Sequence, residues 1–293
     1  MYLHSIIWDI DPILLHIGEG GIRWYGLLWA LGIMICYLIQ IKLYKNENCP
    51  KEWTDHLFVW MVTGAIIGAR LGHCLFYEWH YYQDAIQLFA FNIHYRNPYI
   101  EHPFWLLRIW EGGLSSHGGA IGLIVAAWLL NKKHFSKRPE YHTSLIWIFD
   151  RLVIGVCITG ALIRLGNLMN SEIYGCETTL PWGFKFLRDF PKLSADAVPV
   201  CHPTQIYEAL AYFIMFLVLQ FLYWKKDFGK KYTGMLFGIG FIWVFVFRFI
   251  VEFIKNDQSD FEADMILNMG QLLSIPFIIY GIYLIINAIK KKQ

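Results

Sequence analysis

The sequence predicts an all-α polytopic membrane protein with seven transmembrane helices, a small extracytoplasmic head and an interfacial arm. Of its 293 residues, 56% are hydrophobic and only 16% are charged, whereas a soluble domain carries about a quarter charged residues. Several apolar stretches are each long enough to cross about 30 Å of hydrocarbon as a helix. The segments between these stretches alternate between many and few basic residues, which is typical of a chain that crosses a membrane repeatedly.

The first apolar stretch is predicted to be a retained membrane span. No lysine or arginine occurs between Met1 and Gly21, whereas a secretory signal peptide has a basic segment ahead of its apolar core. One membrane-embedded domain, residues 1–293, is therefore expected. Its spans are predicted at residues 22–41, 55–77, 114–131, 145–165, 205–224, 234–254 and 269–289.

The basic residues predict the orientation of the chain, because positive side chains resist translocation across the membrane. One side of the predicted membrane carries Lys42, Lys45, Lys51, Lys132, Lys133, Lys137, Arg138, Lys225, Lys226, Lys230, Lys231, Lys290, Lys291 and Lys292. The other side carries only Arg96, Arg108, Lys185, Arg188, Lys192 and Lys255. The N-terminus is therefore expected outside and the C-terminus inside, with an aromatic interfacial arm at residues 78–113 and a polar head at 166–204, both external.

All seven predicted spans then place polar residues near the outer leaflet. These residues are Arg23, Tyr25, Arg70, His73, Ser115, Ser116, His117, Arg164, Asn167, Asn170, Gln205, Tyr207, Glu208, Arg248, Glu252 and Gln271. An arginine at the bilayer centre costs about 2.5–3.5 kcal/mol, so several together require a reason. Independent snorkelling is one reason, and a local pair between Arg248 and Glu252 is another. A polar cavity for a phospholipid headgroup is the third; the inner half holds little beyond Asp150 and Arg151.

The densest candidate motif is residues 110–119, with the sequence Trp-Glu-Gly-Gly-Leu-Ser-Ser-His-Gly-Gly. Paired glycines allow a ligand or another backbone to approach closely. The start of a helix offers unpaired N–H groups that bind anions. His117, one turn inside, suits a general base because the ordinary pKa of imidazole is near neutrality. A histidine that merely bonds a neighbouring carbonyl is the alternative.

The second candidate motif follows at residues 164–175, Arg-Leu-Gly-Asn-Leu-Met-Asn-Ser-Glu-Ile-Tyr-Gly. Arg164 and Asn167 are three residues apart, so they share one face of a continuing helix. A guanidinium is planar and permanently charged, and its donors fit a phosphate. This motif therefore predicts an anion-binding site.

Together these motifs resemble those of the prolipoprotein diacylglyceryl transferase family. Residues 110–119 are similar to its W-x-G-G-x-S-x-H-G-G block, and residues 164–175 to its R-x-G-N-x-x-N-x-E-x-x-G signature. Further blocks match in the family's order, at residues 23–26, 68–72, 202–208, 248–253 and 269–271. Departures occur at His73, Ser116, Cys201 and Lys255, where the family usually has other residues, in the case of position 255 an arginine.

The resemblance implies an enzyme that moves the sn-1,2-diacylglyceryl group of phosphatidylglycerol to the lipobox cysteine of a prolipoprotein signal peptide. Glycerol phosphate would leave, and the site would be in the inner membrane of a bacterium. No metal, cofactor or nucleic acid is implied. His117 would help deprotonate the thiol, and Arg164 and Arg248 would hold the phosphate. The residues expected to bind phosphatidylglycerol are Tyr25, Arg70, Gly118, Gly119, Arg164, Asn167, Glu172, Gly175, Glu208, Arg248 and Glu252.

One other expectation and two rival functions remain. Cys176 and Cys201 both fall in the external head, where disulfides persist, so a bridge between them is possible. A transporter or flippase for a lipid or small anion would need polar residues along an inner-half path, where only Asp150 and Arg151 occur. A non-catalytic scaffold would leave the His-Gly-Gly block unexplained.

Overall fold

The computed structural model describes residues 5–18, 20–76, 115–255 and 267–291. It divides into two compact units, which are described separately. The first unit combines Met1–Leu43 with Ile146–Gln293, and the second is Tyr44–Leu145. The predicted interfacial arm, residues 78–113, lies outside the described residues.

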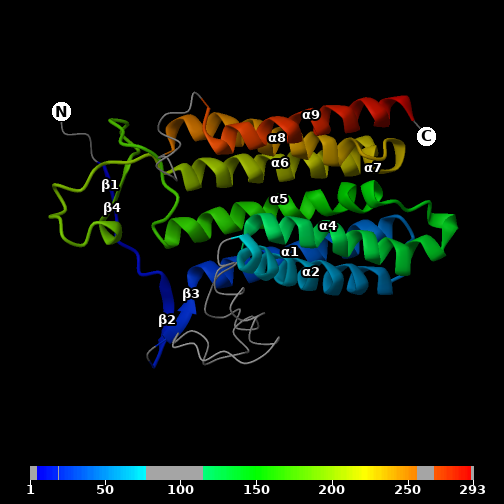
Figure 1. Cartoon of the computed structure of the whole chain (residues 1–293), viewed down its shortest axis with the longest axis horizontal. Helices are drawn as coiled ribbons and strands as arrows, with labels where there is room; N and C mark the ends of the chain where they lie inside the picture. Colours follow the sequence, from blue (N-terminus) through cyan, green and yellow to red (C-terminus); the bar gives the residue numbers. More distant parts are fainter. Residues whose placement is uncertain (1–4, 19, 77–114, 256–266, 292–293) are drawn as a thin grey trace, which may run out of the picture. The chain divides into compact units, whose positions relative to one another are not determined.

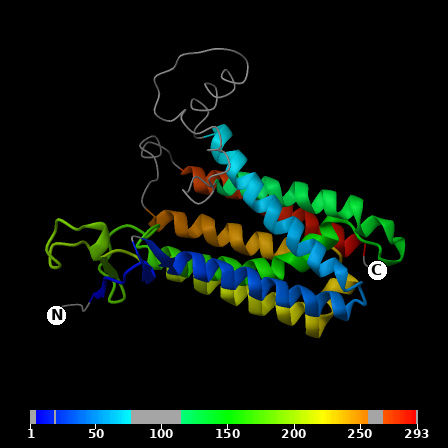
Figure 2. The same ribbon diagram turned by 90° about the horizontal axis from the view of Figure 1, so that it is seen from below.

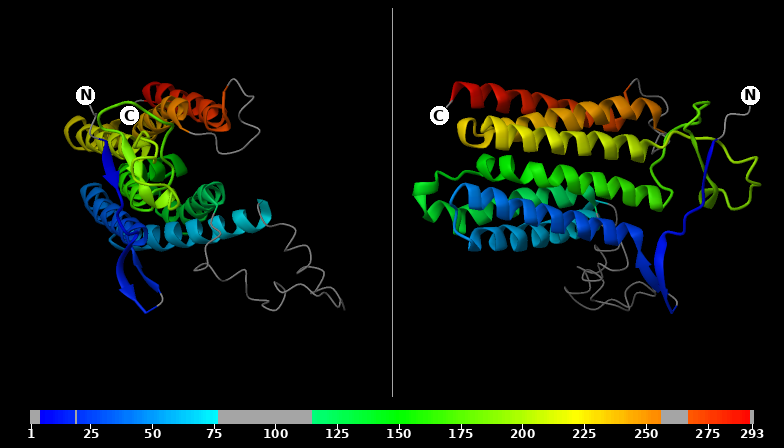
Figure 3. Two further views of the ribbon diagram at one scale, coloured as in Figure 1. Left: turned by 90° about the vertical axis from the view of Figure 1, so that its left-hand side faces the viewer. Right: turned by 180° about the vertical axis from the view of Figure 1, so that it is seen from behind.

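The first unit is built around long helices that run alongside one another (Figures 1 and 3). They are α1 (Trp24–Asn46), α5 (Leu145–Met169), α6 (Thr204–Lys226), α8 (Met235–Val251) and α9 (Met269–Lys290), with the short α7 (Phe228–Lys231) and the 3-10 turn η6 (Glu252–Ile254) between them. Thr159 on α5 donates to the Gly32 carbonyl on α1 at 2.9 Å. A Cβ on Gly160 or Gly240 would lie within 3.2 Å of Tyr212 on α6 or Val153 on α5. α5 is therefore the central helix of this unit.

Two small sheets at one end of the first unit correct the all-α prediction. Strand β1 (Ile6–Trp8) pairs in parallel with β4 (Phe184–Phe186), and β2 (Ile13–Ile17) pairs with β3 (Gly20–Arg23). The first membrane helix consequently begins at Trp24 rather than Ile22. The Trp8 indole donates to the Leu168 carbonyl, 160 residues away, at 2.9 Å. Such a distant partner leaves no local signal in the sequence.

The second unit consists of α2 (Glu52–Phe76), α4 (Ser116–Lys133) and two 3-10 turns, η3 (Phe135–Lys137) and η4 (Pro139–Tyr141). Glycines bring α2 and α4 into close contact: a Cβ on Gly118 would lie 2.7 Å from the Cα of Gly72, and one on Gly68 would lie 2.7 Å from the Cα of Gly122. Small residues every four positions allow membrane helices to approach in this way. Trp53 stacks on Phe135 at the other end, with ring centroids 4.1 Å apart.

Six described helices are long and apolar enough to cross a membrane: α1, α2, α5, α6, α8 continued through η6, and α9. A multi-pass membrane protein is therefore supported. The predicted third span, residues 114–131, is helical as α4, but its 18 residues include a histidine near the start and two lysines at the end. It is not among the six, so a seventh crossing stays a prediction.

Candidate functional site

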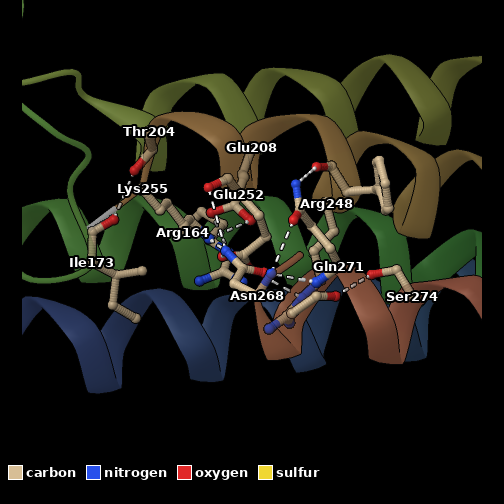
Figure 4. A network of polar contacts seen from close by, with 12 residues as sticks. Arg164, Ile173, Thr204, Glu208, Arg248, Glu252, Lys255, Asn268, Gln271 and Ser274 are labelled. Atoms are coloured by element: carbon tan, nitrogen blue, oxygen red, sulfur yellow. Dashed lines mark hydrogen bonds and ion pairs between the residues drawn. The ribbon is translucent and has the colours of Figure 1, made fainter. Parts of the chain in front are cut away.

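Charged and amide side chains from four helices of the first unit converge at one end of that unit (Figure 4). We call this group the polar cluster. It contains Arg164 and Asn167 from the end of α5, Glu208 from the start of α6, Arg248, Glu252 and Lys255 from the end of α8 and just beyond it, Asn268 and Gln271 from the start of α9, and the adjacent Glu172. The prediction that these spans bring polar groups together at one level is confirmed for this unit.

Glu208 lies at the centre of the polar cluster, and its side chain is 0% exposed. Arg164 Nε is 3.2 Å from Oε2, and Lys255 Nζ is 3.2 Å from Oε1. A buried carboxylate is tolerated only where cations and hydrogen bonds replace its water. Glu208 therefore fixes both cations in position while they neutralise it.

Glu252 is the second anchoring carboxylate. Arg248 Nε lies 3.5 Å and Lys255 Nζ 3.8 Å from its Oε1, and the Asn268 amide donates to Oε2 at 3.4 Å. The carboxylate rests on Gly270, where a Cβ would lie 2.6 Å from Glu252 Cδ. A side chain at position 270 would therefore displace Glu252.

Arg248 is held through one edge of its guanidinium only. Its side chain is 37% exposed, and its ion pair with Glu252 uses Nε. Among the described residues, no acceptor lies within hydrogen-bond distance of its two Nη atoms. Two parallel N–H donors at a partly exposed edge suit a phosphate or carboxylate oxygen pair. The local Arg248–Glu252 pair expected from the i, i+4 spacing is thus present, and it leaves anion-binding capacity unused.

Lys255 belongs to the polar cluster, although it was not among the predicted site residues. Its side chain is 4% exposed, and it bridges the two anchoring carboxylates, Glu208 and Glu252. The backbone of Lys255 pairs with Gly175, and a Cβ on Gly175 would lie 2.8 Å from Thr204 Cγ2. Gly175 therefore acts by letting two chain segments approach. The available signal was spacing, since Lys255 follows Glu252 by three positions.

A chain of side-chain contacts leads from Arg164 to Glu172. Arg164 Nη1 donates to Asn167 Oδ1 at 3.4 Å, and Asn167 Nδ2 donates to Glu172 Oε1 at 2.7 Å. Asn170 Nδ2 reaches the same Glu172 oxygen at 3.2 Å. The predicted sharing of one helix face by Arg164 and Asn167 is therefore confirmed, and the motif's second asparagine orients its glutamate.

The turn that carries Glu172 has an uncommon backbone. Ser171 and Ile173 have φ values of 57° and 61°, a region that is a genuine outlier for a β-branched residue. Two buried side chains hold the turn: Gln205 donates to the Glu172 carbonyl at 2.7 Å, and Thr204 donates to the Ile173 carbonyl at 2.8 Å. Backbone strain of this kind, about 1–3 kcal/mol per residue, persists where surrounding structure enforces it and clusters at functional sites.

Tyr25 belongs to the same end of the first unit. A Cβ on Gly166 would lie 2.8 Å from the Tyr25 ring and 3.2 Å from its Cα, so the start of α1 packs directly against the Arg-x-Gly-Asn segment of α5. The structure thus brings the predicted Tyr25, Arg164 and Asn167 together.

The second unit holds the remaining predicted site residues. Arg70 is buried within α2, with 6% exposure, and His117 is exposed in the first turn of α4. Ser115 caps this helix by accepting from the Gly118 N–H at 3.3 Å. Gly118 packs against α2, whereas a Cβ on Gly119 would make only ordinary contacts at 3.5 Å. Gly118 therefore has a packing role, and its predicted lipid contact stays a prediction.

Asp150 and Arg151, the polar residues of the opposite end of α5, have structural partners. Asp150 accepts from the N–H groups of Gly234 at 2.5 Å and Phe237 at 2.8 Å, where α8 begins. Arg151 donates to the carbonyls of Trp147 at 3.3 Å and Gly229 at 2.7 Å. Because these contacts are with backbone groups, the pair holds helix ends together and does not support the transporter alternative.

The possible disulfide is not formed in the structure, where Cys176 and Cys201 are free cysteines. Cys201 is packed with Leu168, Phe184 and Phe186. Burial, followed by nearby Glu177 and Cys176, raises the pKa of the Cys201 thiol to about 11. A thiol that stays protonated at neutral pH is a poor nucleophile. The protonated thiol of Cys201 therefore does not suit catalysis. A bridge between Cys176 and Cys201 stays a prediction.

Comparison with known proteins identifies the family of this chain. Residues 12–287 match the family described as prolipoprotein diacylglyceryl transferase. The chain belongs to this family. It is 44% identical to the phosphatidylglycerol–prolipoprotein diacylglyceryl transferase of Porphyromonas gingivalis, over 97% of this chain and 95% of that protein. Proteins of the same name from Bacteroides fragilis and Chloroherpeton thalassium are 42% and 39% identical, with at least 96% of each chain covered.

The polar cluster contains two arginines and three glutamates. At position 255 it has a lysine where the resemblance predicts an arginine. A lysine supplies a compact point charge with three donors, which fits its position between two carboxylates. The departure at position 255 therefore leaves the charge of the cluster unchanged.

Proposed function

We propose that this chain transfers the sn-1,2-diacylglyceryl group of phosphatidylglycerol to the cysteine thiol of a prolipoprotein. Family membership over nearly the whole chain supports this reaction. The single structural observation that carries it is the polar cluster, where Arg164 and Arg248 are each fixed by a buried glutamate at one end of a membrane helix bundle. A phospholipid presents its phosphate at the headgroup level, where the ends of membrane helices lie.

The transfer forms one bond and breaks one. The thiolate sulfur attacks the glycerol carbon that bears the phosphate, and the carbon–oxygen bond to the phosphate breaks. The electron pair leaves with glycerol phosphate, and the thiol proton goes to a base. Negative charge accumulates on the departing phosphate, so permanently charged donors directed at it lower the barrier.

Each residue of the polar cluster is assigned a role from its contacts. Arg248 offers its two Nη atoms to the phosphate, since Nε is engaged by Glu252. Arg164 contributes from α5 while Glu208 and Asn167 fix its orientation. Glu172, Lys255 and Asn268 act as positioning residues, because their side chains contact other members of the cluster.

His117 is proposed as the base that accepts the thiol proton. Its ring is exposed at the start of α4, so a substrate can reach it, and a neutral imidazole has a nitrogen that can accept a proton. Arg70, Gly118 and Gly119 of the same unit are proposed to contact phosphatidylglycerol. The substrate cysteine is proposed to be the lipobox cysteine of a signal peptide.

We propose that the polar cluster faces the outside of the bacterial inner membrane. The lysines in the last turns of α1, α6 and α9 support this orientation, because basic residues collect on the cytoplasmic side. The N-terminus and the segment 170–203 are then periplasmic. A cluster at that surface meets exported prolipoproteins and outer-leaflet lipid together.

The test is an assay of purified protein with phosphatidylglycerol and a lipobox peptide. A thioether-linked diacylglyceryl peptide and free glycerol phosphate are the expected products, identified by mass spectrometry. A peptide with serine in place of the cysteine is the matched control and should give no product. Absence of product from the cysteine peptide, in protein shown to be folded, would contradict the proposal.

A further inference from the structure

A second membrane-facing site lies at the opposite end of the first unit from the polar cluster. A groove of about 280 Å³ runs between α1 and α6, lined by Ile35, Leu38, Ile39, Lys42 and Leu43 on one side and Phe216, Gln220 and Trp224 on the other. We call it the α1–α6 groove; Figure 2 shows the two helices in blue and yellow. Trp224 lies more than four turns beyond Glu208 on α6, about 24 Å away along the helix. The proposed reaction therefore does not use this groove.

The α1–α6 groove has an apolar floor and open apolar walls. Ile39 and Leu43 form the floor, with 8% and 0% exposure, whereas Leu38 and Trp224 are 50% and 45% exposed. The α1 residues recur at intervals of three and four, and Phe216, Gln220 and Trp224 recur at four, so each helix presents one continuous face. An elongated apolar ligand that lies along both helices fits this shape.

The polar residues that line the groove are Lys42, toward the C-terminal end of α1, and Gln220, one turn before Trp224 on α6. Lys42 is exposed, and among the described residues no carboxylate pairs with it. Trp224 Nε1 donates to Gln220 Oε1 at 2.7 Å, which directs the Gln220 amide group along the same wall. Lys225 and Lys226 follow in the last turn of α6. The end of the groove is therefore cationic and carries N–H donors.

The position of Lys42 matches the headgroup level of a membrane. The apolar part of α1 begins at Trp24, and Lys42 lies about 27 Å further along the helix, close to the thickness of the hydrocarbon core. Tryptophan and lysine both favour this interface. Basic pockets between membrane helices at a lysine-rich surface bind anionic lipid headgroups.

We propose that the α1–α6 groove binds one glycerophospholipid with an anionic headgroup as a retained, non-substrate lipid. One acyl chain lies over Ile39 and Leu43, and the phosphate contacts Lys42 and the Gln220 amide. The bound lipid connects α1 to α6 on the lysine-rich side of the membrane. Its leaflet is opposite to that of the proposed substrate.

The test measures lipid binding to delipidated protein by native mass spectrometry, with dioleoylphosphatidylserine as probe and dioleoylphosphatidylcholine for comparison. All variants carry Arg248→Ala, so that the proposed substrate site has lost one of its two phosphate-binding arginines. We expect one phosphatidylserine per chain, bound more tightly than phosphatidylcholine. Adding Lys42→Gln should weaken phosphatidylserine binding about fivefold, since one lysine near a headgroup contributes about 1 kcal/mol.

Lys132→Gln is the matched control, because Lys132 is likewise a lysine near the C-terminal end of a long helix, 5.2 Å from the Trp128 ring, and it does not line the α1–α6 groove. It should change binding less than twofold. Leu38→Trp fills the groove and should reduce binding of both lipids, with circular dichroism reporting the fold. Unchanged binding in Lys42→Gln, or an equal loss in Lys132→Gln, would overturn the proposal. The proposal would also be overturned if the protein were a dimer that Leu38→Trp dissociated while lipid binding stayed unchanged, because the groove would then be covered by a second chain.

Discussion

Buried charge occurs at both ends of α5, but it is used differently at each. At one end, Asp150 and Arg151 are 0% and 2% exposed, and their hydrogen bonds include backbone N–H groups at the start of α8 and the Gly229 carbonyl of α7. At the other end, Arg164, Glu208 and Lys255 hold one another through side chains. The two Nη atoms of Arg248, at a partly exposed edge, have no hydrogen-bond acceptor within the described part of the chain. The partners of a buried charge, more than its presence, distinguish a binding site from a structural brace.

The largest effect on turnover is expected at Arg248, in the polar cluster. Arg248→Ala should lower turnover with phosphatidylglycerol and a lipobox peptide by at least about a hundredfold, because it removes donors directed at developing charge. The unfolding midpoint should change little, since the side chain is 37% exposed. Arg188→Ala removes an exposed arginine elsewhere and should leave turnover unchanged. Full activity in Arg248→Ala would remove the distinction between the two ends.

At Asp150, near the other end of α5, we expect the opposite result: a loss of stability without a loss of turnover. Asp150→Ala should destabilise the fold by about 3–5 kcal/mol, because it removes the carboxylate beside the buried Arg151 guanidinium and leaves two N–H groups at the start of α8 without this acceptor. Turnover per folded molecule should stay at the parent level. Thermal unfolding in detergent and the specific activity of the folded fraction measure the two effects. Asp196→Ala, at an exposed site, is the control for loss of an aspartate. A catalytic defect without destabilisation would contradict the structural role.

A third change tests whether Lys255 positions the polar cluster. Lys255→Met removes the charge shared by Glu208 and Glu252, and both carboxylates should shift. A displacement of about 1 Å costs up to about a hundredfold in rate, so kcat should fall between about tenfold and a hundredfold with a smaller change in KM. Lys255→Arg should restore most of kcat, because it restores the charge. Equal loss in both variants would assign Lys255 a packing role only.

Much of this arrangement was predictable from sequence, because helices in a membrane produce strong local signals. The spans α5, α6, α8 and α9 begin and end within a few residues of their predicted limits, and the pairing of Arg248 with Glu252 followed from an i, i+4 spacing. Lys255 was missed because its role depends on Glu208, 47 residues away. The pairing of β1 with β4 was missed for the same reason.

The second unit shows a different limit. Gly64, Gly68 and Gly72 recur every four residues on α2, opposite Gly118 and Gly122 on α4. That periodicity was visible in the sequence and predicts close helix packing. For the glycines next to His117 the sequence allows either a ligand or another backbone, because a single motif does not reveal which group approaches a glycine; the structure shows the α2 backbone against Gly118.

The smallest effect is expected at Arg151, where the charge is kept and only the shape of the donor group changes. Arg151→Lys can reach one of the two carbonyls, Trp147 or Gly229, and loses the stacking of the guanidinium on the Trp147 ring. One lost hydrogen bond of this kind costs about 1–2 kcal/mol, so the unfolding midpoint should fall modestly while turnover is unchanged. Arg164→Lys is the matched variant at the other end of α5. It keeps a charge near Glu208 but loses the fork that also reaches Asn167, so it should lower turnover more than stability. If both lysine variants changed stability and turnover in the same ratio, the two ends of α5 would not differ in function, and their different partners would carry no information about the site.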